Sequence, residues 1–283
     1  MHGVARAPAA ISVVNAIPAG RGAAVAIDRA VTARVELDPT AENVTGAIGD
    51  GRDVDTTLIE RCVAATTAAY GDGEGGTVET AAEVPPSVGL KSSSAAANAA
   101  IAATLDALGR WDDIDNLTAT RLGVEVARDV GVTVTGAFDD ATASMLGGLV
   151  VTDNTDDEVL HRDDLTGPVV LLLPDSRRPT ATVDTDALDA VAPLGALAAD
   201  TALEGRYGLA MTVNGLAVAT ALDLDIAPLR AAMAHTTAVS PSGTGPAVAA
   251  IADADACDAI AEAWSPFGDV LETKLSSVGT TVG

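Results

Sequence analysis

A run of small apolar residues after a proline pair constrains the fold most strongly: Glu83 to Gly109, EVPPSVGLKSSSAAANAAIAATLDALG. Pro85 and Pro86 prevent a helix before them, and the serines from Ser92 to Ser94 are hydroxyl residues that often cap a first helical turn. Nearly every residue from Ala95 to Leu108 favours helix, and a glycine follows as the usual stop. The pattern predicts a buried helix that begins within the serines.

The start of this helix has the features of an anion site. It combines unpaired backbone N–H groups, the positive end of the helix dipole, three hydroxyls and the cation of Lys91. Phosphate is the anion that such a terminus most often binds. The same pattern also describes a well-capped buried helix without a ligand, so the rest of the chain must decide between the two.

The charge of the chain excludes several classes of partner. Asp and Glu number 40 against 16 Lys and Arg, which gives a net charge of −24. Such a field repels nucleic acid and anionic membranes, so neither is expected as a partner. Self-repulsion is screened when the Debye length falls to about 3 Å at about 1 M salt. We therefore expect a protein from a salt-loving cell. No apolar stretch approaches membrane-spanning length, so we also expect the protein to be cytoplasmic.

Several familiar signatures are absent or out of context. Cys62 and Cys257 lie far apart in sequence, with no CxxC pair or clustered histidine that would indicate a metal site. Gly71, Gly73 and Gly76 match GxGxxG, but they follow an expected helix and enclose Asp72 and Glu74, so we interpret them as a turn. No GxxxxGK[ST] loop occurs. Any nucleotide must therefore be held in another way.

The first half of the chain alternates strands and helices. Residues 3–38 predict two or three strands, residues 53–69 an amphipathic helix, and residues 111–128 another helix. Asn15 and Arg21 lie near the first turn and are most simply explained as satisfying loop backbone. The glycine-rich stretch 130–151 is interpreted as a turn that carries Asp139 and Asp140.

The second half repeats the alternation irregularly, which predicts an α+β fold. We place a domain boundary near the acidic stretch 152–167, with one domain over residues 1–155 and the other over 156–283. The expected elements are a strand at 169–173, helices at 184–204, 205–221 and 226–232, a short strand at 235–239, a glycine-rich loop at 240–246, a helix at 247–263 and a strand at 268–274. Each half thus has one small-residue loop that is expected to lead into a helix.

Three segments together resemble the motifs of the GHMP kinase superfamily. The central motif, Pro-x-x-x-Gly-Leu-x-Ser-Ser-Ala, is matched from Pro85 or Pro86 through Gly89-Leu90-Lys91-Ser92-Ser93-Ser94-Ala95. The first motif resembles ARAPAAISVVNAI and the third resembles SPSGTGP, and all three occur in the family's order. Within the superfamily, GLKSSSA, TGAFDDA and SPSGTGPAV are most similar to the archaeal type of shikimate kinase.

The resemblance implies a two-domain fold and an ATP-dependent kinase. The implied N-terminal domain has a βαβ crossover, the implied C-terminal domain is ferredoxin-like, and ATP, Mg²⁺ and the small-molecule acceptor, shikimate, would meet between them. The residues implied in nucleotide binding are Pro86, Val88, Gly89, Leu90, Lys91, Ser92, Ser93, Ser94, Ala95, Gly243, Thr244 and Gly245.

Catalytic roles also follow from the resemblance. Asp139 would accept the proton of the acceptor hydroxyl, with its neighbour Asp140 left open as the alternative, and Lys91 would add positive charge beside the phosphates. A serine hydroxyl, that of Ser93 or alternatively Ser94, and the carboxylate of Glu125 would bind Mg²⁺. These roles agree with phosphoryl transfer in general, which needs charge neutralisation and in-line placement more than covalent chemistry.

Several alternatives stay open at this point. The acceptor could be homoserine or a mevalonate-type alcohol, because the phosphate-binding machinery would look the same. A silent GHMP-like protein that only binds a metabolite is a second alternative. An arginine is expected to pair with the shikimate carboxylate, and the candidates are Arg6, Arg21, Arg177 and Arg178. The oligomeric state, monomer or homodimer, is not set by the sequence.

Overall fold

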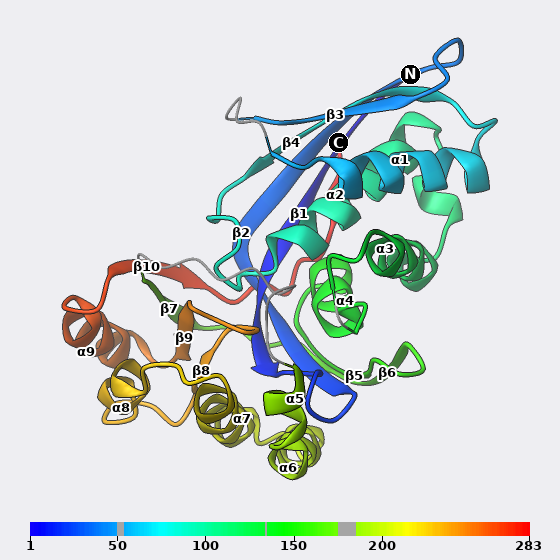
Figure 1. Ribbon diagram of the computed structural model, residues 1–283. Helices are drawn as coiled ribbons and strands as arrows, with labels where there is room; N and C mark the ends of the chain where they lie inside the picture. Colours follow the sequence, from blue (N-terminus) through cyan, green and yellow to red (C-terminus); the bar gives the residue numbers. More distant parts are fainter. Residues whose placement is uncertain (50–53, 134, 175–184) are drawn as a thin grey trace.

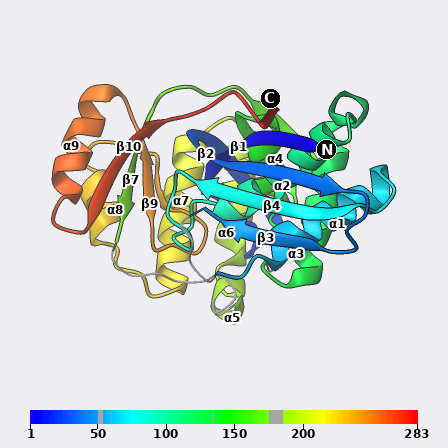
Figure 2. The ribbon, with the colours of Figure 1, turned by 90° about the horizontal axis from the view of Figure 1, so that it is seen from above.

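Two β-sheets with helices packed against them make up the computed structural model, which is an α+β fold (Figure 1). It describes residues 1–49, 54–133, 135–174 and 185–283. The chain ends come close together because the last strand pairs with the first. Figure 2 shows the two sheets side by side, with β7, β9 and β10 in one and β1 to β4 in the other.

The first sheet is built around one long strand, β2 (Arg21–Asp38). It pairs along one side with β1 (His2–Val14), and along the other with β4 (Gly75–Ala82) and, nearer its start, β5 (Leu149–Asp153). The remaining strands are β3 (Val44–Ile48), which is parallel to β4, β6 (Glu158–Asp163), which pairs with β5, and β11 (Thr281–Val282), which pairs with β1. The two or three strands predicted within residues 3–38 are therefore two.

Helices cover one side of this sheet. Helix α1 (Thr57–Tyr70) connects the parallel strands β3 and β4 and so forms the βαβ crossover that the resemblance implied. Helix α2 (Ser92–Ala107) packs directly on β1 and β2. Its small residues allow this, and a Cβ on Gly3 of β1 would collide with the Ala103 carbonyl of α2. The 3₁₀ turn η1 (Trp111–Asp113) and the helices α3 (Asn116–Val130) and α4 (Phe138–Leu146) follow.

The second sheet has four antiparallel strands. They are β7 (Pro168–Leu173), β8 (Val239–Pro241), β9 (Val248–Ile251) and β10 (Asp269–Lys274), in the spatial order β10-β7-β9-β8. Numbered by chain order this is 4-1-3-2, the arrangement of a ferredoxin-like βαββαβ unit. The helices of this half are α5 (Thr185–Asp189), α6 (Ala192–Leu203), α7 (Tyr207–Ala221), α8 (Ala227–Ala232) and α9 (Ala254–Trp264).

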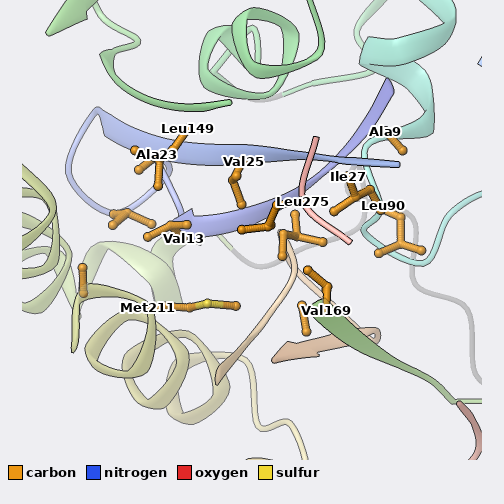
Figure 3. Packing of buried hydrophobic residues seen from close by; sticks show 14 of the residues in the cluster. Ala9, Val13, Ala23, Val25, Ile27, Leu90, Leu149, Val169, Met211 and Leu275 are labelled. Atoms are coloured by element: carbon orange, nitrogen blue, oxygen red, sulfur yellow. The ribbon is translucent and has the colours of Figure 1, made fainter. Parts of the chain in front are cut away.

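A shared hydrophobic core joins the two halves. Its fully buried members include Val13 of β1, Val25 and Ile27 of β2, Val169 of β7 and Met211 of α7. Figure 3 shows these side chains between the crossing strands of the first sheet and the elements of the second. Because strand residues alternate between faces, neighbours such as Ala10 and Ala24 lie on the opposite face, in a separate cluster with α4 and β5. The two sheets therefore share one core, and the first sheet has a further, smaller cluster on its other face.

Three sequence-based expectations were wrong at the level of local structure. Residues 247–263 form β9 and then α9, because Val248–Ile251 pairs with β7 on one side and β8 on the other, and this pairing overrides the helix propensity of alanine. The short strand expected at residues 235–239 lies instead at Val239–Pro241. Asp139 and Asp140 belong to the first turn of α4 and not to a turn between strands. The loop 240–246 thus leads into a strand.

The boundary between residues 155 and 156 stays a prediction. Strand β6 lies beyond it in sequence, yet it pairs with β5 in the first sheet, and β11 returns to the same sheet. A division after β6 therefore fits the sheets better. In the described ranges, no helix combines the length and apolar character needed to cross a membrane.

Candidate active site

The loop before α2 is shaped by left-handed backbone conformations. Ser87, Gly89 and Lys91 all have positive φ values, of 60°, 95° and 59°. Helix α2 begins at Ser92, as the sequence predicted, but the residue in the N-cap position is Lys91, and the serines form the first turn. Since Lys91 has no side-chain acceptor to cap that turn, the first N–H groups of α2 are left available to an anion.

The three motif segments meet at this loop. The Ser242 hydroxyl donates to the Gly89 carbonyl at 2.7 Å, and the Gly243 N–H donates to the Ser12 hydroxyl at 3.0 Å. The Asn15 amide donates to the Gly243 carbonyl at 3.0 Å. A Cβ on Gly89 would collide with the Ser242 carbonyl, so this glycine lets the second and third motifs touch. The expected convergence of the motifs is therefore what the structure shows, and Asn15 satisfies loop backbone as expected.

Two adjacent carboxylates at the start of α4 face the same site. Asp140 pairs with the Lys91 ammonium, with its Oδ2 at 2.8 Å from Nζ. Burial raises the pKa of the Asp140 carboxyl to about 7, and the neighbouring Asp139 carboxylate adds to this, whereas Lys91 opposes it. The Oδ1 atom of Asp140 is buried without a hydrogen-bond partner among the residues that the structure describes. Asp140 is thus the counter-ion of Lys91.

Asp139 has a different environment. Its side chain is buried, and its Oδ1 accepts a hydrogen bond of 2.8 Å from the neutral amide of Asn154. Its Oδ2 lies over Gly22 of β2, where a Cβ would come within 2.5 Å. No ion pair of Asp139 occurs within the described parts of the chain. Asp139 is therefore the member of the carboxylate pair that has a neutral amide, and not a cation, as its described partner.

A cavity of about 590 Å³ lies between these segments, within the usual size of a small-molecule site. One part is lined by the start of α2 and the third motif, and another by α3, the residues after it and α4. Lys91 is the single cation among the described lining residues. Of the residues implied in binding or catalysis, the cavity is lined by Gly89, Lys91, Ser92, Ser93, Ser94, Asp139, Gly243 and Thr244.

The other implied residues lie outside the cavity lining. Val88, Leu90 and Ala95 are buried in the core, where they support the loop from below, and Pro86 is exposed. Gly245 has a positive φ of 72° and shapes the third motif without lining the cavity. Glu125 is exposed on α3, and the structure does not bring it together with the cavity carboxylates.

The arginine candidates for a substrate carboxylate are not at the described cavity wall. Arg6 pairs with Glu83 at 3.2 Å, and Arg21 pairs with Asp200 at 2.7 Å, so both have an ordinary salt-bridge role. Arg177 and Arg178 lie outside the described residues.

Sequence reasoning missed the neutral groups that organise the site. Ser12, Gly22 and Asn154 come from strands or strand ends of the first sheet and contact the motif residues directly. Ser12 lies in β1 and Asn154 directly follows β5, but their places in the sequence do not say which polar residue meets which loop. Only the pairing of β2 with β1 and β5 supplies that information.

Comparisons with known proteins show the family of this chain. Residues 57–148 match the family model described as GHMP kinases N terminal domain. The chain is 48% identical over 280 residues to a shikimate kinase of Halobacterium salinarum, with 99% of each chain covered. A shikimate kinase of Methanothrix thermoacetophila is 46% identical over 269 residues, covering 95% of this chain and 91% of the relative. The chain belongs to the shikimate kinase family within the GHMP kinases.

Family membership makes this protein a kinase that uses ATP. The two-domain α+β fold is shared with solved GHMP kinases. The crystal structure of a homoserine kinase from Cytophaga hutchinsonii superposes with a TM-score of 0.78 at 18% identity, covering 100% of this chain and 97% of that one. At such identity the likeness shows the fold of this kinase and not its substrate.

Proposed function

We propose that this GHMP kinase transfers the γ-phosphoryl group of ATP to a hydroxyl of shikimate, giving shikimate 3-phosphate and ADP. The observation that carries the proposal is identity of 48% to a shikimate kinase over 99% of both chains. The cavity supports it, because a cationic, N–H-rich end and a buried carboxylate face one space of suitable size. The alternatives with homoserine or a mevalonate-type alcohol keep the same fold, but the homoserine kinase from Cytophaga hutchinsonii is only 18% identical and a solved mevalonate kinase only 12%.

The start of α2 is proposed as the triphosphate site. The N–H groups of its first turn, the Ser92–Ser94 hydroxyls and the Lys91 ammonium all border the cavity. Gly243 and Thr244 border it from the third motif, and a Cβ on Gly243 would lie 3.0 Å from the Lys91 Nζ. Backbone N–H groups at a helix start and a nearby ammonium neutralise phosphate charge, which is the main demand of phosphoryl transfer.

Asp139 is proposed as the general base. The acceptor hydroxyl oxygen attacks the γ-phosphorus, the bond from that phosphorus to the bridging oxygen of ADP breaks, and the hydroxyl proton passes to the Asp139 carboxylate. Asp139 is suited to this because a neutral amide holds it and no cation pairs with it among the described groups. Asp140, already paired with Lys91, is the less suitable member of the couple.

A magnesium ion is part of the proposal, and the residues present fit it. Mg²⁺ in kinases is usually held by substrate phosphates, a few waters and one or two protein oxygens. The Ser93 hydroxyl borders the cavity and makes no hydrogen bond within the described chain, so it is available as such a ligand. When bound, Mg²⁺ would neutralise charge on the β- and γ-phosphates. Glu125 is not proposed as a ligand because it lies away from the cavity.

The test is ADP release in molar KCl with MgATP, offering shikimate, homoserine and mevalonate separately. We expect turnover with shikimate, and a fall of about 10²-fold or more in kcat for Asp139→Asn, the usual contribution of a general base. Asp112→Asn, at an exposed site in η1, is the control and should be unaffected. Turnover with another alcohol alone would overturn the substrate, and no turnover in a folded, ATP-binding protein would indicate a silent binder.

A further inference from the structure

The side chain that contacts Asp139 comes from a different part of the chain. Asn154 follows β5 directly and, like Asp139, is almost fully buried, with exposures of 4% and 3%. Its Nδ2 atom donates to Asp139 Oδ1 at 2.8 Å. A buried amide that donates to a carboxylate at this distance makes a charge-assisted hydrogen bond, which is stronger than a bond between neutral groups. The contact therefore fixes the carboxylate of Asp139 in one orientation.

A second residue fixes the amide in turn. The hydroxyl of Thr152 donates to Asn154 Oδ1 at 2.6 Å, and Thr152 is fully buried. The two side chains share one face of the strand because they are two residues apart. Since the hydroxyl and the carboxylate need opposite ends of the amide, only one amide orientation satisfies both. The second N–H bond of Nδ2 points toward the Thr135 hydroxyl at 3.5 Å.

The backbone of Asn154 is also anchored. Its N–H donates to the Gly20 carbonyl at 2.8 Å, and its carbonyl accepts from the Arg128 guanidinium at 3.3 Å. In the adjacent ladder Thr152 pairs with Gly22, the residue over which Asp139 Oδ2 lies. Asn154, directly after β5, thus gives one hydrogen bond to the first oxygen of Asp139, and Gly22 of the paired strand β2 leaves room for the second.

We propose that Asn154, oriented by Thr152, is a positioning residue for phosphoryl transfer: it aims the Asp139 carboxylate at the acceptor hydroxyl while leaving its charge unpaired. The inference rests on the proposed role of Asp139 as the base. A lysine or arginine at this position would neutralise Asp139 and weaken it as a proton acceptor. A neutral donor supplies orientation without that loss, and the available cation, Lys91, is bound by Asp140.

Several charged groups around Asp139 bear on the pH dependence of the site. On α4 the neighbour is Asp140, at the start of α2 it is Lys91, and on α3 it is Arg128, which is engaged with Asp157 at 2.7 Å. On β2, Arg21 pairs with Asp200. Of these groups, Arg128 contacts Asn154, and only at its backbone carbonyl. A change at Asn154 therefore alters the immediate partner of Asp139 and leaves these ion pairs in place.

The test compares Asn154→Ala and Asn154→Asp with the parent kinase, using shikimate and MgATP. We expect kcat to fall by about 10- to 100-fold in Asn154→Ala, as a misplaced catalytic group does, with the KM for ATP nearly unchanged. In both variants the acidic limb of the kcat profile should move to higher pH. Loss of a donor, or gain of a second carboxylate, makes ionisation of Asp139 less favourable.

A second pair of variants keeps the inference testable if Asn154 variants fold poorly. Thr152→Val removes only the hydroxyl that orients the amide, and we expect a smaller fall in kcat with the same direction of pH shift. Thr104→Val is the matched control, because Thr104 is equally buried but its hydroxyl donates only to Ala100 in its own helix. It should leave kcat and the pH profile unchanged.

The outcomes separate the two proposals. If Asp139→Asn is inactive but the Asn154 and Thr152 variants keep the parent kcat and pH profile, the positioning role is overturned and the proposed function stands. If Asp139→Asn itself keeps the parent kcat, the base assignment fails and the positioning role fails with it. A fall in kcat without any shift of the pH profile would indicate a merely structural contact and would also overturn the inference.

Discussion

At the scale of single residues, the two neighbouring carboxylates of the site have different partners: Asp140 pairs with Lys91, and Asp139 accepts a hydrogen bond from Asn154. Lys91 and Asp140 form an ion pair with side chains only 12% and 9% exposed. When one partner of a buried pair is removed, the other is left as an uncompensated charge, which is strongly unfavourable. In the proposed function the triphosphate would approach the same ammonium, so Lys91 would link nucleotide binding to the state of Asp140.

Replacing Lys91 with methionine should separate these effects. We expect kcat/KM for ATP to fall by about 10²-fold or more, the usual loss on removal of one preorganised charge donor. The Lys91 ammonium opposes the rise in the pKa of Asp140. Without this ammonium the pKa should rise above about 7, so that Asp140 is protonated at neutral pH. Steady-state kinetics and ATP titration measure the first effect, and carbon-detected NMR of the Asp140 carboxyl measures the second.

The control for this change is Lys274→Met. Lys274 is also paired with an aspartate, Asp28 at 3.3 Å, but its side chain is 69% exposed and lies on β10. Exposed pairs contribute about 0–1 kcal/mol, so this variant should behave as the parent does. Equal kinetic losses in both variants would mean that total charge, and not the position of Lys91, controls ATP use.

At the scale of elements, the proposed base lies where α4 meets the paired antiparallel strands β2 and β5. The contact is close because Gly22 has no side chain: a Cβ there would lie 2.5 Å from Asp139 Oδ2 and 2.9 Å from the Ala16 Cβ. The approach of α4 to the sheet therefore sets the position of the proposed base.

Gly22→Ala should push the Asp139 carboxylate away from its place. We expect a fall in kcat of about 10- to 100-fold, because small displacements of a catalytic group have effects of this size. Gly49→Ala is the control, since its Cβ would meet nothing closer than 3.4 Å. Circular dichroism checks that both variants fold, and an unchanged kcat in a folded Gly22→Ala protein would contradict the importance of this contact.

Local signals predicted those elements whose own residues favour one type of secondary structure. The prolines, serines and alanines fixed α2 to within a residue of its start, and the apolar run at residues 169–173 was found as β7. Strand β9 was predicted as helix, because alanine favours helix until β7 and β8 flank it with hydrogen-bond partners. Asp139 was found through its motif, whereas Asn154 was missed because its role arises only when β5 pairs with β2.

At the scale of the whole molecule, acidic charge shapes the behaviour of the surface. The net charge of −24 is carried by many exposed side chains, among them Asp258 and Glu262 on α9. These two are four residues apart on the same helix, where like charges repel. Glu262 also lies near the negative end of the α9 dipole, which is unfavourable for an anion.

Raising KCl from 0.1 M to 2 M should raise the Tm of this kinase, because the screening length falls from about 10 Å at 0.1 M to about 3 Å at 1 M.

The double change Asp258→Asn and Glu262→Gln should raise Tm at 0.1 M KCl by about 1 °C. One such repulsion costs about 0.2–0.5 kcal/mol, and 1 kcal/mol shifts the Tm of a protein approaching this size by about 2–4 °C. The gain should disappear at 2 M KCl.

A different substitution on the same helix distinguishes screening from ordinary helix stability. The carboxylate of Asp253 accepts a hydrogen bond of 2.9 Å from the Ala256 N–H and so caps α9. Asp253→Ala also removes a negative charge, yet it should lower Tm at both KCl concentrations, because a lost cap costs about 1 kcal/mol and salt does not restore the hydrogen bond. Thermal unfolding of the parent, the double variant and Asp253→Ala at both KCl concentrations therefore distinguishes charge screening from the loss of a helix cap. If the double variant gains as much at 2 M as at 0.1 M, repulsion between surface carboxylates is not what limits this fold at low salt.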